Sequence, residues 1–259
     1  MGGTIFLQEN AILSLVDKGG EMKLPLLEMK AKDLKKWESE YNRLIESPRG
    51  KWLKKKTDRR RRLREISTFI DKYCPEIRTG FGSLIDVGCG PGELMEIARY
   101  HGHDTWGIDA ISGNGGMGDE YLSMCKLLTK RQGLRVDYIG CRGWNINWES
   151  RNNPAAHLIV CRGAIEQIMH ESMDGVPHDI HHNCMAMSWQ ETNETVDRLV
   201  DFCSKARICG RPNGHLLIHA NGARNTGWYD EAIVRAARES GFQLVMRDGE
   251  RLHQFRLVL

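Results

Sequence analysis

At 259 residues, with 41% hydrophobic and 27% charged positions, the chain is long enough for one α/β core with a helical addition and too short to favour a second catalytic domain. The net charge is +3, and the eight cysteines are scattered without a CxxC pair, so we expect reduced thiols and no metal site. No apolar run reaches the roughly 18 to 20 residues of a membrane span and no secretory leader pattern is present, so a cytoplasmic protein without a membrane span is expected.

Two or more helices are predicted ahead of the core, between about residues 24 and 73. Apolar residues recur there at spacings of three and four, and a turn at residues 47–50 interrupts the pattern. Trp37 and Tyr41 lie one helical turn apart, a spacing that favours packing in a core over a cap on a ligand pocket.

Basic residues concentrate between Arg49 and Arg64, where ten Lys and Arg accompany a single acid, Asp58. This segment has a balance of +9 against an overall +3, so the rest of the chain carries −6. Such a block is either a solvated helix face or a surface for an anionic partner, such as nucleic acid, a phosphorylated substrate or lipid headgroups. Both interpretations stay open at the level of sequence.

From Gly82 onward, short apolar runs alternate with helical segments, a pattern typical of a parallel sheet with crossover helices. The last two predicted strands are joined by Asp248-Gly249 and form an antiparallel hairpin. We therefore predict an α/β fold with a Rossmann-like, mostly parallel, seven-stranded sheet and a C-terminal antiparallel hairpin, preceded by an N-terminal helical segment. The predicted strands are 84–87, 105–108, 136–139, 157–161, 215–219, 242–247 and 252–259, with helices over 93–101 and 230–240.

The most informative segment is the turn Gly88-Cys89-Gly90-Pro91-Gly92, between the first strand and its helix. Because glycine has no side chain, a ligand can approach the backbone of this turn. The N-terminus of the following helix presents free N–H groups, so the turn predicts a nucleoside-cofactor site. Glu93 stands where a dinucleotide motif has its third glycine, and its carboxylate would face a pyrophosphate, which disfavours NAD and FAD. Asp109 follows Asp86 by 23 residues, close to the offset at which an acid binds ribose hydroxyls.

Residues 84–109 resemble motif I and the ribose-binding acid of class I S-adenosylmethionine (SAM)-dependent methyltransferases. The turn before the fifth strand, 210–218, and the hairpin around Asp248-Gly249 resemble the corresponding parts of that family. The resemblance covers roughly residues 82–259. It implies SAM as the cofactor and a SAM-binding methyltransferase domain over residues 79–259, preceded over residues 1–78 by a helical lid or substrate segment.

The resemblance also implies which residues contact the cofactor. Asp86 and the glycines of the turn would hold the methionine end, and Asp109 would hold the ribose. An acid often follows the third strand near the adenine amine in this family, but none is present here, and Asp137 lies too early. The implied cofactor-binding residues are Asp86, Gly88, Cys89, Gly90, Gly92, Asp109, Ala110, Trp144 and Cys161.

Methyl transfer from a sulfonium mainly requires alignment of the reactants and, for a hydroxyl acceptor, removal of a proton. After the fourth strand, many small-molecule methyltransferases carry a Glu-His pair, and Gln167 takes the position of that histidine here. His170 and His219 are the candidate bases, because histidine titrates near neutral pH. Arg162, at the tip of the fourth strand, is the candidate for holding an acidic or phosphorylated acceptor.

Three functions follow from these patterns. The favoured one is O-methylation of a small-molecule or saccharide-like acceptor. The first alternative is an RNA or DNA methyltransferase that uses the basic segment 49–64, although the Asn/Asp-Pro-Pro-aromatic motif of amino methylation is absent from the sequence. The second alternative is a non-catalytic SAM-binding protein, because a fold can persist without its chemistry.

Overall fold

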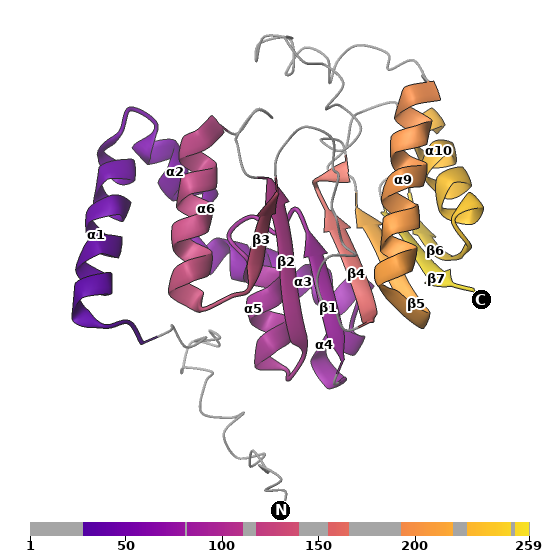
Figure 1. Cartoon of the computed structure of the whole chain (residues 1–259), viewed down its shortest axis with the longest axis horizontal. Coiled ribbons are helices and arrows are strands. Elements are labelled where there is room, and N and C mark those ends of the chain that lie inside the picture. Colours follow the sequence, from indigo (N-terminus) through magenta and orange to yellow (C-terminus); the bar gives the residue numbers. More distant parts are fainter. Residues whose placement is uncertain are drawn as a thin grey trace, which may run out of the picture.

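The computed structural model describes residues 28–80, 82–110, 118–139, 155–165, 193–219, 227–249 and 252–258. One sheet lies between layers of helices, with further helices beyond its β3 edge (Figure 1). The strands are β1 (Ser83–Val87), β2 (Asp104–Ala110), β3 (Val136–Ile139), β4 (Ala156–Arg162), β5 (Gly210–His219), β6 (Phe242–Asp248) and β7 (Leu252–Leu257). The helices of the described ranges are α1 (Ala31–Glu46), α2 (Gly50–Lys56), α3 (Arg59–Tyr73), α4 (Glu76–Thr79), α5 (Glu93–Tyr100), α6 (Gly118–Gln132), α9 (Asn193–Cys209) and α10 (Gly227–Glu239).

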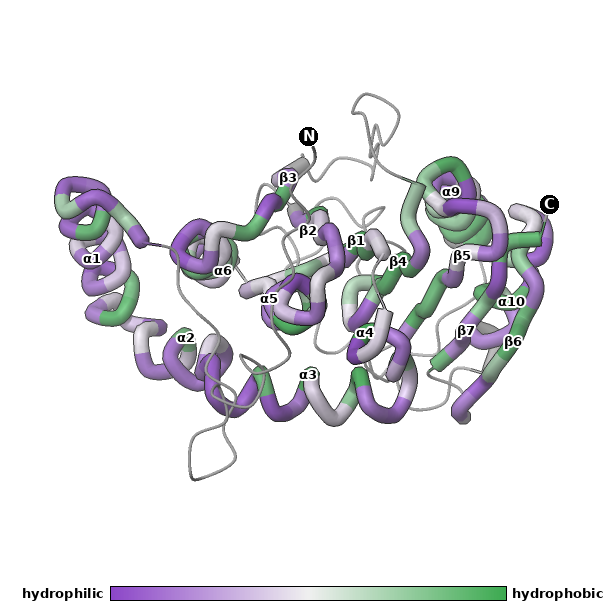
Figure 2. Tube along the Cα trace, turned by 90° about the horizontal axis from the view of Figure 1, so that it is seen from below, coloured by the Kyte–Doolittle hydropathy of each residue, from purple (hydrophilic) through white to green (hydrophobic). Residues whose placement is uncertain are grey.

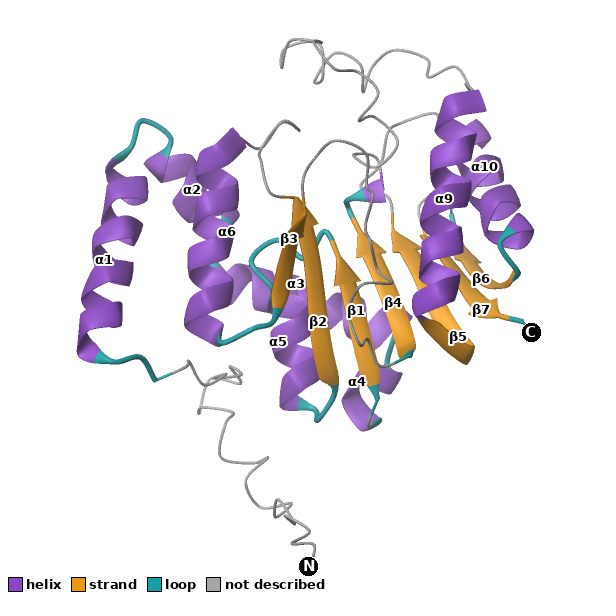
Figure 3. Cartoon of the chain, in the orientation of Figure 1, coloured by secondary structure: helices purple, strands orange, loops and turns teal. Residues whose placement is uncertain are grey.

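The sheet has seven strands in the order β3-β2-β1-β4-β5-β7-β6. Strands β1 to β5 run parallel, and β7 is antiparallel to both β5 and β6. This architecture confirms the predicted fold class. The order reverses between β1 and β4, and the parallel strands end at one common edge, the upper one in Figure 3. Open α/β sheets bind ligands at such a reversal, outside the carboxyl ends of the strands.

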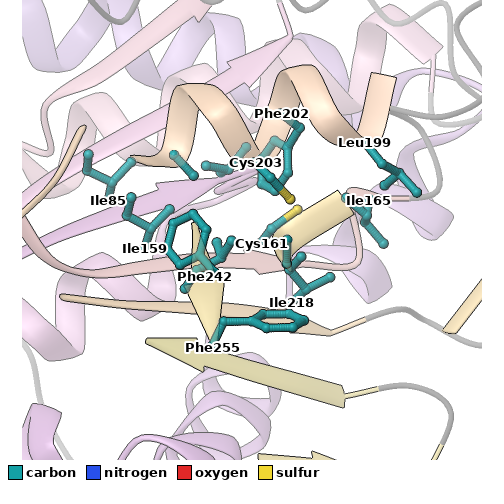
Figure 4. Close-up of a cluster of buried hydrophobic side chains, with 14 of the residues drawn as sticks. Ile85, Ile159, Cys161, Ile165, Leu199, Phe202, Cys203, Ile218, Phe242 and Phe255 are labelled. Atoms are coloured by element: carbon teal, nitrogen blue, oxygen red, sulfur yellow. The ribbon is translucent and has the colours of Figure 1, made fainter. Parts of the chain in front are cut away.

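Helices α9 and α10 cover one face of the sheet. Because strand residues alternate between faces, Ile85, Ile159 and Ile218 all point to this side. Figure 4 shows them together with Phe202 and Cys203 of α9 in a cluster of buried side chains. Burial of this apolar surface stabilises the sheet against its helices by about 25 cal/mol for each Å² removed from water.

Helices α3 and α5 cover the opposite face. Leu63, Ile66 and Phe69 of α3 share one buried cluster with Leu84 of β1 and Val160 of β4. Figure 2 shows α3 running along the sheet from α2 toward β7. The last long helix of the predicted N-terminal segment therefore belongs to the core that supports the strand ends.

Helices α1 and α2 pack against α6 and form a smaller apolar cluster. The Trp37 ring stacks on Tyr41 at 5.0 Å, and its Nε1 donates a hydrogen bond of 2.7 Å to the Leu127 carbonyl. This agrees with the core interpretation of the two aromatic residues. None of the helices in the described ranges combines the length and the apolar composition needed to cross a membrane.

Candidate functional site

The turn after β1 is built from glycines in the left-handed region. Gly88, Gly90 and Gly92 have φ values of +73°, +53° and +87°. A Cβ on Gly88 would lie 2.3 Å from the Cβ of Ala164, so neither the backbone angle nor the space admits a side chain there. The turn thus presents bare backbone at the point where the strand order reverses.

Asp109, at the end of β2, lies directly beside this turn. The Gly90 N–H donates a hydrogen bond of 2.8 Å to Oδ2 of Asp109. The β1–β2 register brings the two together, since Val87 pairs with Ile108 and the Gly88 N–H donates to the Ile108 carbonyl at 2.8 Å. An ionised carboxylate has about four lone-pair positions, so Asp109 can accept ligand hydroxyls while it keeps its bond to Gly90. The structure thus brings together the two halves of the site that the sequence predicts.

Asp86 lies beneath the turn on the α3 face of the sheet, with only 4% of its surface exposed. Burial and the nearby charge of Asp109 raise its pKa to about 7, against an opposing effect of Arg162. Asp86 therefore holds its proton nearly to neutral pH, and a positively charged ligand would favour its ionised form.

The expected role of Glu93 as a free acid facing a ligand is wrong. Its side chain is 2% exposed and accepts two hydrogen bonds from Arg62 of α3, at 2.5 Å from Nε and 3.0 Å from Nη2. Arg59 likewise pairs with the buried Glu96. The charge of Glu93 is compensated by a residue 31 positions earlier, so it gives no ground for rejecting a phosphate-bearing ligand.

Two residues that the sequence analysis did not single out border the glycine turn. Around Gly90, the Tyr121 hydroxyl and Nη2 of Arg62 lie 3.4 and 3.8 Å from the position that a Cβ would take. A signal for Arg62 was present in the sequence, because Arg59 and Arg62 have the same three-residue spacing as Glu93 and Glu96. Nothing local marked Tyr121, since only packing of α6 brings it to the turn.

Arg162 and His219 end neighbouring strands and are paired in the β4–β5 register. Both lie next to Phe69 of α3, with the Arg162 guanidinium 5.3 Å and the His219 ring 5.5 Å from the Phe69 ring centre. The Tyr73 ring lies 6.5 Å from that of His219. Burial and the nearby Arg62 charge lower the pKa of Arg162. The structure thus brings together two of the three predicted catalytic residues. They lie at the ends of β4 and β5, and β4 is the neighbour of β1, which leads into the glycine turn.

Four further predicted site residues lie in β2, in β4 or outside the described residues. His170 and Trp144 lie outside the described residues. Ala110 ends β2, and the side chain of Cys161 is fully buried in the core on the α9 face. Asp137 accepts a hydrogen bond of 2.8 Å from the Trp106 indole. Among the described residues no cluster of three metal-ligating side chains occurs.

No model of a known protein family matches the sequence, and no curated protein matches it. Similar solved structures include a TehB-like SAM-dependent methyltransferase from Corynebacterium glutamicum, at 12% identity over 77% of this chain and 95% of that chain, with a TM-score of 0.45. An O-methyltransferase family protein from Burkholderia thailandensis is 13% identical over 83% of this chain and 60% of that chain, with a TM-score of 0.46. DesVI from Streptomyces venezuelae is 12% identical over 90% of this chain and 100% of that chain, with a TM-score of 0.48.

All three similarities have TM-scores below 0.5. The fold is therefore defined by the chain's own topology. The mostly parallel seven-stranded sheet, the antiparallel C-terminal hairpin and the glycine turn after β1 are the features that the resemblance implies, and the structure adds the strand order β3-β2-β1-β4-β5-β7-β6. The chain has the Rossmann-like fold of class I SAM-dependent methyltransferases.

Proposed function

We propose that this chain is a SAM-dependent methyltransferase that O-methylates a small-molecule acceptor. One observation carries the proposal. A turn of three left-handed glycines ends the strand next to the reversal of the sheet, and the Asp109 carboxylate lies 2.8 Å from the Gly90 amide within it. Bare backbone beside a carboxylate suits the sugar of a nucleoside cofactor.

The residues present fit SAM at each of its polar ends. Asp86 is a buried carboxylate on the same strand and would favour the positive charges of the methionine end. Asp109 would accept the ribose hydroxyls, and the bare backbone of Gly90 lies beside its carboxylate. A Cβ at Gly88 would clash with Ala164, so close approach of a ligand depends on that glycine.

SAM, when bound, supplies an electrophilic methyl group on a positively charged sulfur. The chain's own residues would then hold the acceptor and receive its proton. Arg162 would fix the acceptor, and a ring nitrogen of His219 would take the proton as the acceptor oxygen bonds to the methyl carbon and the methyl–sulfur bond breaks. His219 is half-buried at the end of β5, where it pairs with Arg162 of β4, and its ring lies 5.5 Å from that of Phe69 and 6.5 Å from that of Tyr73.

Charge pairing within the basic segment favours a small acceptor over nucleic acid. Arg59 and Arg62 are committed to buried acids of α5, and Arg49 and Arg61 lie 3.7 and 3.3 Å from Glu120 and Glu65. Four of the ten basic side chains of the segment are therefore paired with acids.

We further propose that residues 1–78 act as the lid or substrate segment, supported by the position of Phe69 of α3 beside Arg162. Residues 79–259 would form the SAM-binding domain. The cytoplasmic location stays a prediction.

Transfer of label tests this function. The protein would be incubated with methyl-labelled SAM and an extract of the source cell, and the product would be fractionated by size. The proposal expects label in a small-molecule product, stoichiometric release of S-adenosylhomocysteine, and loss of both in Asp109→Ala. Label in RNA or DNA would replace it by the nucleic-acid alternative, and binding of SAM without any transfer would replace it by the non-catalytic one.

A further inference from the structure

The acceptor side of the site contains an arginine whose hydrogen-bonding capacity is not used within the described residues. The Nε of Arg162 is buried and has no hydrogen-bond partner there, and no ion pair of this side chain occurs in the same ranges. A buried donor without an acceptor costs about 1 to 3 kcal/mol. An oxygen anion supplied by a ligand would remove that cost.

Arg62 shows how a carboxylate pairs with a half-buried arginine in this chain, and it can be compared with Arg162. Its Nε and Nη2 are both occupied by the two oxygens of Glu93, at 2.5 and 3.0 Å, in a side-on bidentate pair. Arg162 is likewise half-buried and lies on the same face of the sheet, but no carboxylate of the described residues occupies its Nε. A planar carboxylate matches two N–H groups of a guanidinium better than any neutral acceptor does.

Of the three acids whose charges act on Arg162, two are paired with other arginines. Glu93 is held by Arg62, and Glu65 lies 3.3 Å from Arg61 at the surface. Asp86 lies on β1 beneath the glycine turn, and its pKa is raised by burial and by Asp109, so at neutral pH its charge is incomplete. The electrostatic balance around Arg162 therefore favours an incoming anion.

Aromatic rings form the wall on which that anion would be held. The Arg162 guanidinium lies over the Phe69 ring. The rings of Tyr73 and His219 lie 5.3 and 5.5 Å from the Phe69 ring. Tyr73 is fixed by its hydroxyl, which donates to Asp248 at 2.7 Å and accepts from Lys72 at 2.7 Å. A cluster of three rings, one of which has the guanidinium over its face, suits a flat, unsaturated ligand, because aromatic faces pack on one another and on guanidinium planes.

We propose that the methyl acceptor is an aromatic carboxylate, held by a side-on bidentate pair between its carboxylate and Arg162, with its ring against Phe69. This proposal rests on the proposed function for the identity of the site as the acceptor site, but the binding itself needs no methyl transfer. The oxygen that is methylated would be a hydroxyl group on the acceptor's ring, and the pair with Arg162 would set the distance from that hydroxyl to His219.

Binding of simple probes tests this proposal. Benzoate, benzyl alcohol and phenyl phosphate would be titrated calorimetrically into the protein with and without S-adenosylhomocysteine. Benzoate is expected to bind at least about tenfold more tightly than the neutral benzyl alcohol, a difference of about 1.4 kcal/mol. Arg162→Gln should lose this preference, whereas Arg162→Lys should keep part of it, because a lysine retains charge without the bidentate fork.

Arg64→Gln is the matched control, since Arg64 is an exposed arginine on the same helix as Phe69. It should bind benzoate as the unmodified protein does. Unchanged thermal melting of Arg162→Gln and Arg162→Lys would show that the loss of binding is local.

Equal binding of benzoate and benzyl alcohol, or benzoate binding that survives Arg162→Gln, would overturn the proposal. Preference for phenyl phosphate by tenfold would overturn it in favour of a phosphorylated acceptor. Arg162-dependent benzoate binding by a protein that does not bind S-adenosylhomocysteine would refute the proposed function and leave this anion site standing.

Discussion

Gly88 and Gly249 both have positive φ values, +73° and +61°, but their surroundings differ. A Cβ on Gly88 would lie 2.3 Å from Ala164, whereas a Cβ on Gly249 would meet nothing within 4 Å. Gly249→Ala should therefore lower the free energy of unfolding only by the backbone strain, about 1 kcal/mol, and Gly88→Ala by about 3 kcal/mol, since overpacking adds to the strain. Urea unfolding of the two variants measures this difference, and equal losses would show that Ala164 gives way.

Asp86 makes stability depend on pH in a defined direction. Its pKa is about 7 in the folded chain and 3.8 for an unperturbed carboxyl, which stands for the unfolded chain. Between these two pH values the folded chain therefore binds more protons than the unfolded chain does. The contribution of Asp86 to the free energy of unfolding is then largest below about pH 4 and is lost as pH rises toward 7. Asp86→Asn should abolish this loss and exceed the unmodified protein in stability at pH 8 by a few kcal/mol, at most about 4. Urea midpoints from pH 4 to pH 8 check it; parallel curves would contradict the raised pKa.

Residues whose role depends on local chemistry were predictable from the sequence. The glycine turn and Asp109 follow from one strand, one bend and one neighbouring strand, and the structure joins them through the Gly90 amide. Glu93 was misinterpreted because its charge is set by Arg62, which a local pattern does not reveal. Long-range pairing therefore limits what a sequence says about a charged side chain.

At the scale of elements, two ion pairs fix α3 to α5 beside the glycine turn. Arg62→Leu would leave Glu93 buried without its partner, and the free energy of unfolding should fall by about 3 to 5 kcal/mol. The double variant Arg62→Leu, Glu93→Leu should recover most of that loss, because no uncompensated charge remains. A double-mutant cycle by chemical unfolding gives the coupling.

The control for this cycle is Arg64→Leu, on the exposed side of α3. Its effect should stay within about 0.5 kcal/mol. A double variant as unstable as Arg62→Leu alone would show that packing of the side chains, rather than charge, joins the two helices.

The strands were predicted within a few residues because alternating or continuous apolar runs follow directly from burial of the sheet. β5 is the exception, since it begins at Gly210 instead of 215 and pairs there with Ala156 across an irregularity in register. α6 was not assigned individually from the sequence. Its buried residues Leu122, Met124, Cys125 and Leu127 occupy more than one side of the helix, so the sequence shows no single apolar face.

At the scale of the whole molecule, positive charge that is free of the described ion pairs is concentrated on α2. Lys54, Lys55 and Lys56 are exposed in its last turn. Replacing all three by Ser should leave S-adenosylhomocysteine affinity unchanged and reduce any RNA affinity, which for a phosphate contact surface falls steeply between about 50 and 200 mM salt. Filter binding across this salt range checks it, and RNA binding that is unchanged in the triple variant would contradict a phosphate contact surface on α2.

The N-terminal and C-terminal parts of the chain meet at the site through α3. Its residues share a core with β1 and β4, and Lys72 and Tyr73 contact Asp248 of the C-terminal hairpin at 2.8 and 2.7 Å. The boundary near residue 78 was predicted from a change in pattern, and α3 shows that such a change does not mark where packing ends. Elements on both sides of residue 78 build the face on which Arg162 and His219 lie.

Calorimetric titration of S-adenosylhomocysteine and SAM into the folded protein tests the central claim most directly, with Asp109→Ala beside the exposed control Asp33→Ala. We expect saturable heat at one site per chain, an affinity lowered at least about tenfold by Asp109→Ala, and no change in the control. Absence of heat with either compound, in protein whose melting shows it to be folded, would contradict the assignment of the glycine turn and Asp109 as a SAM site.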